Sequence, residues 1–118
     1  MPDPQPAVGP YTPVMRAGDW LVVSGQVGMR DGAFPEGGFQ AQVTQAVANL
    51  RAQLEANGAS LSNVVKTTVF LTDIANFEPM NEAYIAAFGG HRPARSAFAV
   101  AALPVGASVE IEAWAYVG

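Results

Sequence analysis

Apolar residues recur at helical spacing in two segments of the chain. Within residues 39–57 they stand four, three and four positions apart, which places them on one side of an α-helix, and Gly58 follows as a C-terminal stop. A second stripe begins after Asn76, whose short side chain suits a helix N-cap, and ends at the glycine pair 89–90. The two stripes consist of Val43, Val47, Leu50 and Leu54, and of Met80, Tyr84 and Phe88.

Four other segments are typical of strands, because β-branched and aromatic residues recur there with a period of two. These segments are residues 19–27, 63–72, 94–102 and 108–117. In the first, alternation places Trp20, Val22, Ser24 and Gln26 on one face and Leu21, Val23 and Val27 on the other. In the second, it groups Val65, Thr67, Val69 and Leu71. In the last, apolar residues alternate with Glu110, Glu112, Trp114 and Tyr116.

The order of these elements predicts an α+β sandwich with both helices on one face of a sheet. The other face of the last strand carries two carboxylates beside two aromatic rings, which is typical of neither a solvent face nor a core. We expect one domain from the 118 residues. Half of them are hydrophobic and only 14% are charged, against about 25% in an average soluble domain. A second copy of the chain is therefore the expected cover for the open face.

Composition narrows the possible partners and chemistry. The longest runs without Asp, Glu, Lys or Arg have 14 residues, below the roughly 18 needed to span a membrane. No basic residue precedes Arg16, so we expect no secretory signal and a cytoplasmic location. The net charge of −4 disfavours nucleic-acid binding. With no cysteine and a single histidine, thiol catalysis and zinc-type sites are excluded.

Arg95 and two glutamates are the candidates for chemistry that the residues themselves suggest. Arg95 enters a strand that is otherwise mostly apolar, so its guanidinium either reaches solvent or holds an anion such as a carboxylate. Glu110 and Glu112 share one strand face, where they either form a solvated edge or ion pair, or supply a general acid/base or water-positioning group. Neither choice is settled by spacing alone.

Six short segments occur together in a recognisable order and spacing. They are Gly-Pro-Tyr at 9–11, Val-Ser-Gly-Gln at 23–26, Val-Lys-Thr-Thr-Val at 65–69, Asn-Glu-Ala-Tyr at 81–84, Arg-Pro-Ala-Arg-Ser at 92–96 and Val-Glu-Ile-Glu-Ala at 109–113. In this arrangement the chain resembles the RidA/YjgF family of reactive enamine and imine deaminases, from Gly9 to its C-terminus. The resemblance implies a chorismate-mutase-like α+β fold with a mixed sheet, and homotrimers with substrate clefts between subunits.

The resemblance also assigns roles to residues. Arg95 would grip the substrate carboxylate and Glu110 would orient or activate a water, and both would be catalytic. The residues that would line the cleft with Arg95 are Tyr11, Ser24, Gly25, Asn81 and Ala97. Many relatives carry cysteine at the position of Ala97, so any contact there would come from its backbone N–H. The loop 89–93 is shorter than in many members, which would reshape the cleft rim.

The implied activity is the hydrolysis of reactive 2-imino and enamine acids to 2-oxo acids with release of ammonia, as in a 2-iminobutanoate/2-iminopropanoate deaminase, without cofactor or metal. Two alternatives remain open: a trimer that binds small carboxylate ligands without turning them over, and a pathway-specific hydrolase of aminoacrylate or amide substrates. An RNA-acting role is disfavoured by the negative charge. For Glu112 we expect a structural role on the face that lines the trimer's central barrel.

Overall fold

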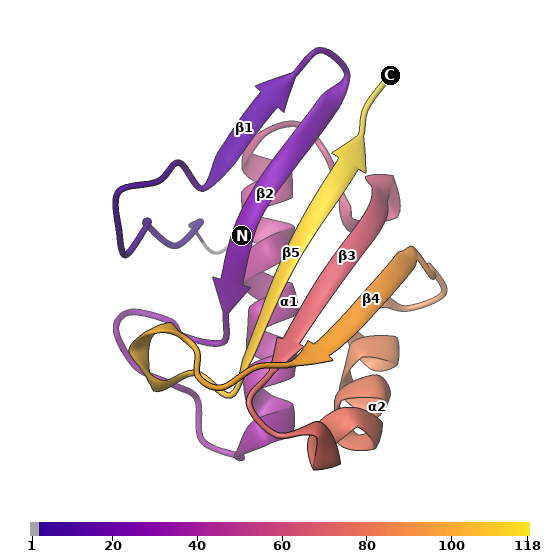
Figure 1. Cartoon of the computed structure of the whole chain (residues 1–118). Helices are drawn as coiled ribbons and strands as arrows, with labels where there is room; N and C mark the ends of the chain where they lie inside the picture. The colour runs from indigo at the N-terminus through magenta and orange to yellow at the C-terminus, as the bar shows by residue number, and fades with distance from the viewer. Residues whose placement is uncertain (1–2) are drawn as a thin grey trace.

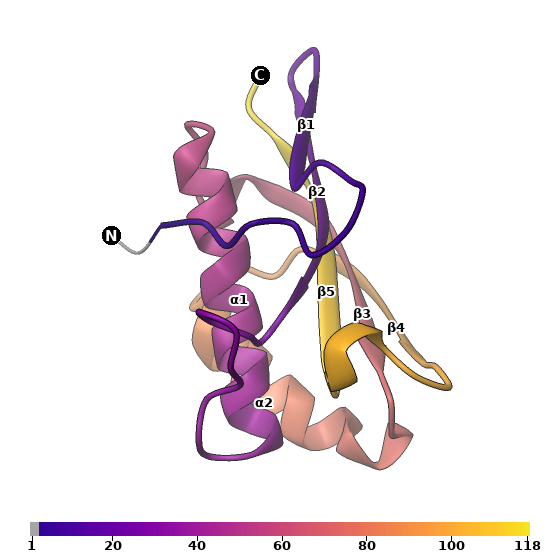
Figure 2. The same ribbon diagram turned by 90° about the vertical axis from the view of Figure 1, so that its left-hand side faces the viewer.

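A mixed five-stranded sheet carries both helices on one face (Figures 1 and 2). The computed structural model describes residues 3–118. Its strands are β1 (Val14–Ala17), β2 (Trp20–Val27), β3 (Val64–Leu71), β4 (Ala94–Ala99) and β5 (Val109–Tyr116), and its helices are α1 (Phe39–Ala56) and α2 (Phe77–Phe88). The sheet order is β1-β2-β5-β3-β4, in which only the β3–β4 pair is parallel. The predicted α+β architecture is confirmed, and the short edge strand β1 is an element that the pattern did not reveal.

The core lies between the helices and the sheet. All the stripe residues predicted on α1 and α2 are buried, and they meet the apolar side of β5, on which Val109, Ile111, Ala113 and Ala115 have no exposed surface. Burying an aliphatic side chain of this size stabilises the fold by about 1.5–3 kcal/mol. The helical periodicity and the alternation of β5 were therefore both predicted correctly. Asn76 is indeed the N-cap of α2, although its side chain makes no capping hydrogen bond.

The second strand contains a β-bulge that reverses its faces. Val23 pairs with Ala113 and Gln26 pairs with Ile111, so β2 advances three residues where β5 advances two. The extra residue turns Gln26 towards the helices, where it is 7% exposed, and turns Val27 to the open face beside Glu110. Strict alternation from Trp20 had predicted the reverse for both residues, and that prediction was wrong.

The third strand contains a similar irregularity near its start. Val64 pairs with Ala115 and Lys66 pairs with Trp114, which leaves Val65 as the extra residue. Val64 is therefore buried at 2% exposure, whereas Val65 is 44% exposed. Placing Val65 with the buried residues of this strand was wrong for the same physical reason as in β2. Both bulges lie on the strands that flank β5.

Within residues 3–118 no sheet or α-helix lies over the face of the sheet away from α1 and α2 (Figure 2). This face carries an aromatic cluster in which the ring centroids of Trp20 and Tyr116 lie 5.1 Å apart and those of Trp20 and Trp114 lie 6.2 Å apart. Trp114, Tyr116 and Phe98 are 46%, 44% and 52% exposed. We call this surface the open face. Within residues 3–118 no helix has both the length and the apolar character needed to cross a membrane.

Candidate functional site

The predicted site residues fall into two groups on opposite faces of the sheet. Arg95 pairs with Thr67, which is fully buried under the helices, whereas Glu110 pairs with Phe70 and Val27 on the open face. The two residues are also two strands and three positions apart, which amounts to about 10 Å in each direction. We call the group around Arg95 the arginine half-site and the group around Glu110 the glutamate half-site.

The arginine half-site is built on the inward face of α2. The guanidinium of Arg95 lies 5.0 Å from the ring centroid of Tyr84 and 5.6 Å from that of Phe77. Its Nη1 donates a weak hydrogen bond to Sδ of Met80 at 3.6 Å. These cation–π contacts hold the planar group without occupying most of its N–H donors. Arg95 is thereby oriented and remains able to bind an anion.

The hydroxyl of Tyr84 completes this support. Tyr84 Oη lies 2.7 Å from Thr67 Oγ1 in the core. Burial raises the pKa of Tyr84, and this effect exceeds the lowering caused by the hydrogen bond to Thr67 and by the charges of Arg95 and Arg92. Tyr84 therefore stays neutral and serves as a fixed surface beneath Arg95.

Asn81 and Ala97 lie on the same side of the sheet as Arg95. Asn81 borders a hollow of about 340 Å³ that is also lined by Tyr84 and Arg95. Its Oδ1 atom is buried and has no hydrogen-bond partner among residues 3–118. A buried acceptor without a donor is costly, so this atom is available to an N–H group of a ligand. Ala97 pairs with Val69 two positions along the edge strand and offers only a methyl group.

The glutamate half-site depends on the bulge in β2. A Cβ atom added to Gly25 would lie 2.6 Å from Cδ of Glu110 and 2.8 Å from its Oε2, closer than real Cβ contacts. Only glycine therefore allows the carboxylate to rest against the backbone at this point. Gly25, Ser24 and Glu110 line a cavity of about 560 Å³ on the open face, together with Tyr11 and Glu112.

The environment of Glu110 changes its proton affinity. Partial burial raises the pKa of its carboxyl above the ordinary value of 4.5, and the negative charge of Glu112 raises it further. A carboxyl that holds its proton more tightly than usual is suited to taking up and returning a proton near neutral pH. Glu112 thus acts on Glu110 electrostatically, and its structural role in an assembly stays a prediction.

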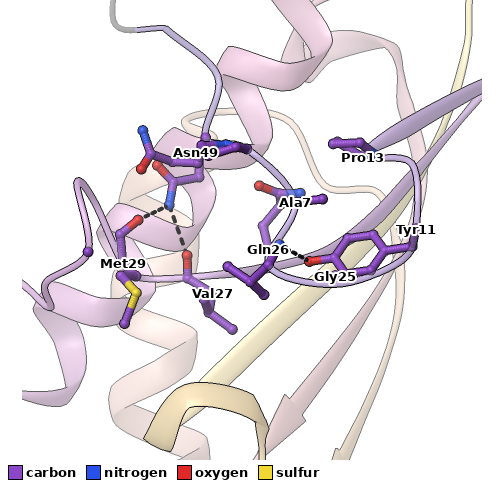
Figure 3. A pocket seen from close by; sticks show the side chains of 12 residues that line it. Ala7, Tyr11, Pro13, Gly25, Gln26, Val27, Met29 and Asn49 are labelled. Carbon is purple, nitrogen blue, oxygen red and sulfur yellow. Dashed lines mark hydrogen bonds between the residues drawn. The ribbon is translucent and has the colours of Figure 1, made fainter.

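The segment that precedes β1 holds Tyr11 over this half-site. Ser24 Oγ donates to the carbonyl oxygen of Thr12 at 2.7 Å, and Tyr11 Oη accepts from the backbone N–H of Val8 at 3.3 Å. Figure 3 shows Tyr11 at the side of a second, mostly apolar cavity of about 220 Å³, into which Gln26 points. Tyr11 lines both cavities, as do Val8, Gly25 and Val27.

Comparison with known proteins identifies the family. A family model described as Endoribonuclease L-PSP matches residues 3–117. The 2-iminobutanoate/2-iminopropanoate deaminase of Mus musculus is 45% identical, over 95% of this chain and 84% of its own length. A RutC family protein of Pyrococcus horikoshii is 42% identical, over 96% of this chain and 90% of its own length. The chain belongs to the RidA/YjgF family.

A solved member of this family has the same fold. The crystal structure of RidA from an Antarctic Psychrobacter superposes with a TM-score of 0.90 at 42% identity and covers 98% of this chain and 94% of that one. The fold is accordingly the chorismate-mutase-like fold of RidA/YjgF proteins, as the sequence resemblance implied. Within residues 3–118 no group of three His, Cys, Asp or Glu side chains is placed to hold a metal ion.

Sequence reasoning named candidate residues for the chemistry but missed the residues that support them. Tyr84 was interpreted only as a core residue of α2, and Phe77 was not singled out. A tyrosine on a buried stripe is itself a signal, because its hydroxyl needs a partner in the core. The amide of Asn49 was also missed; it donates to the carbonyl oxygens of Val27 and Met29 at 2.9 and 2.8 Å and so fixes the strand beyond the bulge (Figure 3).

Gly25→Ala is expected to displace the Glu110 carboxylate. The added methyl group overlaps the glutamate side chain, so the crystal structure of the variant should show Glu110 in a different rotamer. Denaturant unfolding should show only a small change in stability, about 0.5 kcal/mol or less, because the flexible glutamate side chain can turn away. Gly90→Ala is the matched control, because nothing lies within 4 Å of a Cβ there. An unmoved Glu110 in the Gly25→Ala structure would contradict the assigned contact.

Glu110→Gln is expected to be more stable than the wild type at pH 7. The folded state raises the pKa of Glu110, so the unfolded chain ionises more easily and the charged form lowers stability. The gain should stay below about 1 kcal/mol because the group is half exposed. It should vanish as the pH falls below about 4.5, where the carboxyl is protonated in both states.

Urea unfolding at a series of pH values and one fixed protein concentration measures this difference. The exposed Glu36 provides the control, since Glu36→Gln should shift stability at no pH by a comparable amount. A Glu110→Gln variant that is less stable than the wild type at pH 7, or whose advantage grows towards acid, would show that Glu110 is stabilised as an anion.

Proposed function

We propose that this protein is a cytoplasmic hydrolase that converts reactive 2-imino and enamine acids into 2-oxo acids and ammonia. The observation that carries the proposal is that one chain presents both Arg95, a guanidinium held on aromatic rings with free donors, and Glu110, a carboxyl of raised pKa, one in each half-site. The mouse relative that shares 45% of its residues with this chain is named a 2-iminobutanoate/2-iminopropanoate deaminase. A guanidinium that can bind a carboxylate and a carboxyl that can transfer protons are both suited to the hydrolysis of an imino acid.

The reaction requires the protein only to position the substrate and to transfer protons. An enamine first takes a proton on its β-carbon while its nitrogen releases one, and becomes the imine. Water then adds its oxygen to the C=N carbon, and the nitrogen takes up the proton that the water loses, which gives a carbinolamine. The hydroxyl of the carbinolamine loses its proton, the amino nitrogen gains one, and the C–N bond breaks to give ammonia and the 2-oxo acid. One water is consumed and one ammonia released, so no redox partner or covalent nucleophile is needed.

Arg95 would hold the substrate carboxylate next to the C=N bond. Its planar fork can donate two parallel hydrogen bonds to a carboxylate, and the rings of Tyr84 and Phe77 keep the fork in one orientation. A lysine would supply the charge but not this geometry. The buried Oδ1 of Asn81 is an acceptor for the imine N–H in the same hollow.

Glu110 would be the proton carrier. As the carboxylate it accepts a proton from the attacking water, and as the acid it protonates the leaving nitrogen. Its raised pKa reduces the free-energy difference between the carboxylate and the carboxylic acid at neutral pH, which favours both proton transfers. The cavity beside Gly25 and Ser24 offers room for the water.

We infer further that the working form is a homotrimer with clefts between subunits. One small substrate cannot reach both half-sites of a single chain, because they lie on opposite faces of the sheet. In a trimer whose sheets face a central barrel, the arginine half-site of one subunit meets the glutamate half-site of the next. The exposed aromatic cluster on the open face supports such an assembly, since Trp114 and Tyr116 would gain a cover.

A coupled assay tests the activity. An amino-acid oxidase generates 2-iminopropanoate and related imines, and their decay is followed with and without the protein. The wild type should accelerate the decay, and Arg95→Ala should lower kcat/KM about 100-fold, because two charged hydrogen bonds are lost. Arg95→Lys should recover only part of this. Unaccelerated decay with a folded wild type that still binds carboxylates would instead favour the alternative of a binding protein without turnover.

Mixing two impaired variants tests the shared cleft. Arg95→Ala and Glu110→Gln should each retain only about 1% of the wild-type activity when assayed alone. If each cleft takes its arginine from one subunit and its glutamate from the next, equimolar random trimers contain intact clefts at about a quarter of the sites. Co-refolded mixtures should therefore recover about a quarter of the wild-type activity. No recovery from mixed trimers, verified by native mass spectrometry, would mean that each cleft is built by one subunit.

A further inference from the structure

The hollow beside Arg95 contains a second guanidinium group. Arg92 lies in the loop 89–93 and lines this hollow together with Arg95 and Asn81. The catalytic scheme above uses Arg95 alone, because a single carboxylate suffices for an imino acid. Arg92 therefore has no part in the proposed reaction, although it stands at the place where the substrate carboxylate would bind.

The loop holds Arg92 in a defined position. The Nη1 atom of Arg92 donates to the carbonyl oxygens of Gly89 and His91 at the end of α2. The ring of His91 in turn lies with Nε2 2.7 Å from the carbonyl oxygen of Val64, which ties the loop to the start of β3. Among the described residues no hydrogen bond or ion pair engages Nε or Nη2 of Arg92. Three N–H donors of a pre-positioned cation thus remain free.

The charges around the hollow leave a positive excess. Its lining contains two arginines and one acidic residue, Glu78, which forms no ion pair with either of them within the described chain. Both guanidinium charges act on the hydroxyl of Tyr84 and lower its pKa, although burial raises it more. Arg92 and Arg95 therefore line the same hollow, and a ligand whose single carboxylate is held by Arg95 would leave the free N–H donors of Arg92 without a partner.

We propose that Arg92 binds a second carboxylate, and that the preferred substrates are 2-imino acids with an acidic side chain, the imines of dicarboxylic amino acids. This inference rests on the proposed deaminase function and concerns its substrate class. Arg95 holds the carboxylate next to the C=N bond, and the free N–H donors of Arg92 hold the one at the far end. The competing explanation is that Arg92 only neutralises the carbonyl end of α2.

The ratio of two specificity constants separates these explanations. We would measure kcat/KM for iminosuccinate, generated by an aspartate oxidase, and for 2-iminopropanoate, generated by an amino-acid oxidase. The wild type should prefer iminosuccinate, and Arg92→Gln should lower the ratio of the two constants about tenfold, the value of one hydrogen-bonded charge. The contact of His91 Nε2 with the carbonyl oxygen of Val64 does not involve Arg92, so the loop keeps this anchor in the variant.

Two further measurements make the test specific. Arg16→Gln removes the same charge from an exposed site on β1, and it should leave the ratio unchanged. Added salt should lower the wild-type ratio more than that of Arg92→Gln, because an exposed ion pair is screened. Arg92→Lys should keep part of the preference, since it retains the charge without the fork.

The other outcomes overturn the inference in distinguishable ways. An unchanged ratio in Arg92→Gln, or an equal loss for both substrates, would mean that Arg92 supports the loop and does not read the substrate. A wild type that turns over 2-iminopropanoate in an Arg95-dependent way without preferring iminosuccinate would leave the proposed function standing and remove the inference. A wild type that accelerates neither reaction would remove the proposed function itself.

Discussion

The two faces of β5 determine most of this molecule. The strand lies at the centre of the sheet, and its four apolar residues are completely buried beneath the helices. Because side chains alternate, burying these residues forces Glu110, Glu112, Trp114 and Tyr116 onto the other side. The fold thus creates an acidic and aromatic surface as a direct result of making its core. That surface leaves two aromatic rings partly exposed, and it carries the carboxyl group of Glu110.

The bulges beside β5 explain both the site and the errors of the sequence-based prediction. Each adds one residue to a neighbouring strand, which reverses the faces of everything beyond it. No hydrophobic pattern marks them, since Val64 and Val65 are equally apolar and Gly25 has no side chain to place. The helices and β5 could be predicted because long periodic segments average over local irregularities. The position of a single inserted residue cannot be predicted in this way, because it does not change the overall periodicity of the segment.

The candidate site was predictable in its residue types and not in its arrangement. The motif around Arg95 and the acidic last strand could be recognised along the chain, and the likeness to RidA/YjgF proteins named the same residues. The sequence predicted that Glu110 lies on the face away from the helices, but it could not show that Arg95 lies on the face towards them. That depends on the register of β3 against both β4 and β5, which is a property of the folded sheet. The role of Tyr84 could not be predicted either, because it depends on Arg95 of the edge strand β4 lying over its ring.

Keeping the two half-sites apart has an electrostatic consequence. If Arg95 and Glu110 met within one chain, they would form an ion pair that lowered the pKa of the glutamate and occupied the arginine fork. Because they lie on opposite faces, the carboxyl of Glu110 keeps a raised pKa beside Glu112. The guanidinium of Arg95 packs on aromatic rings, and most of its N–H donors stay free. In the proposed trimer the two would come together around a substrate whose own carboxylate satisfies Arg95. The substrate would then neutralise the arginine, and Glu110 would remain free to carry the proton.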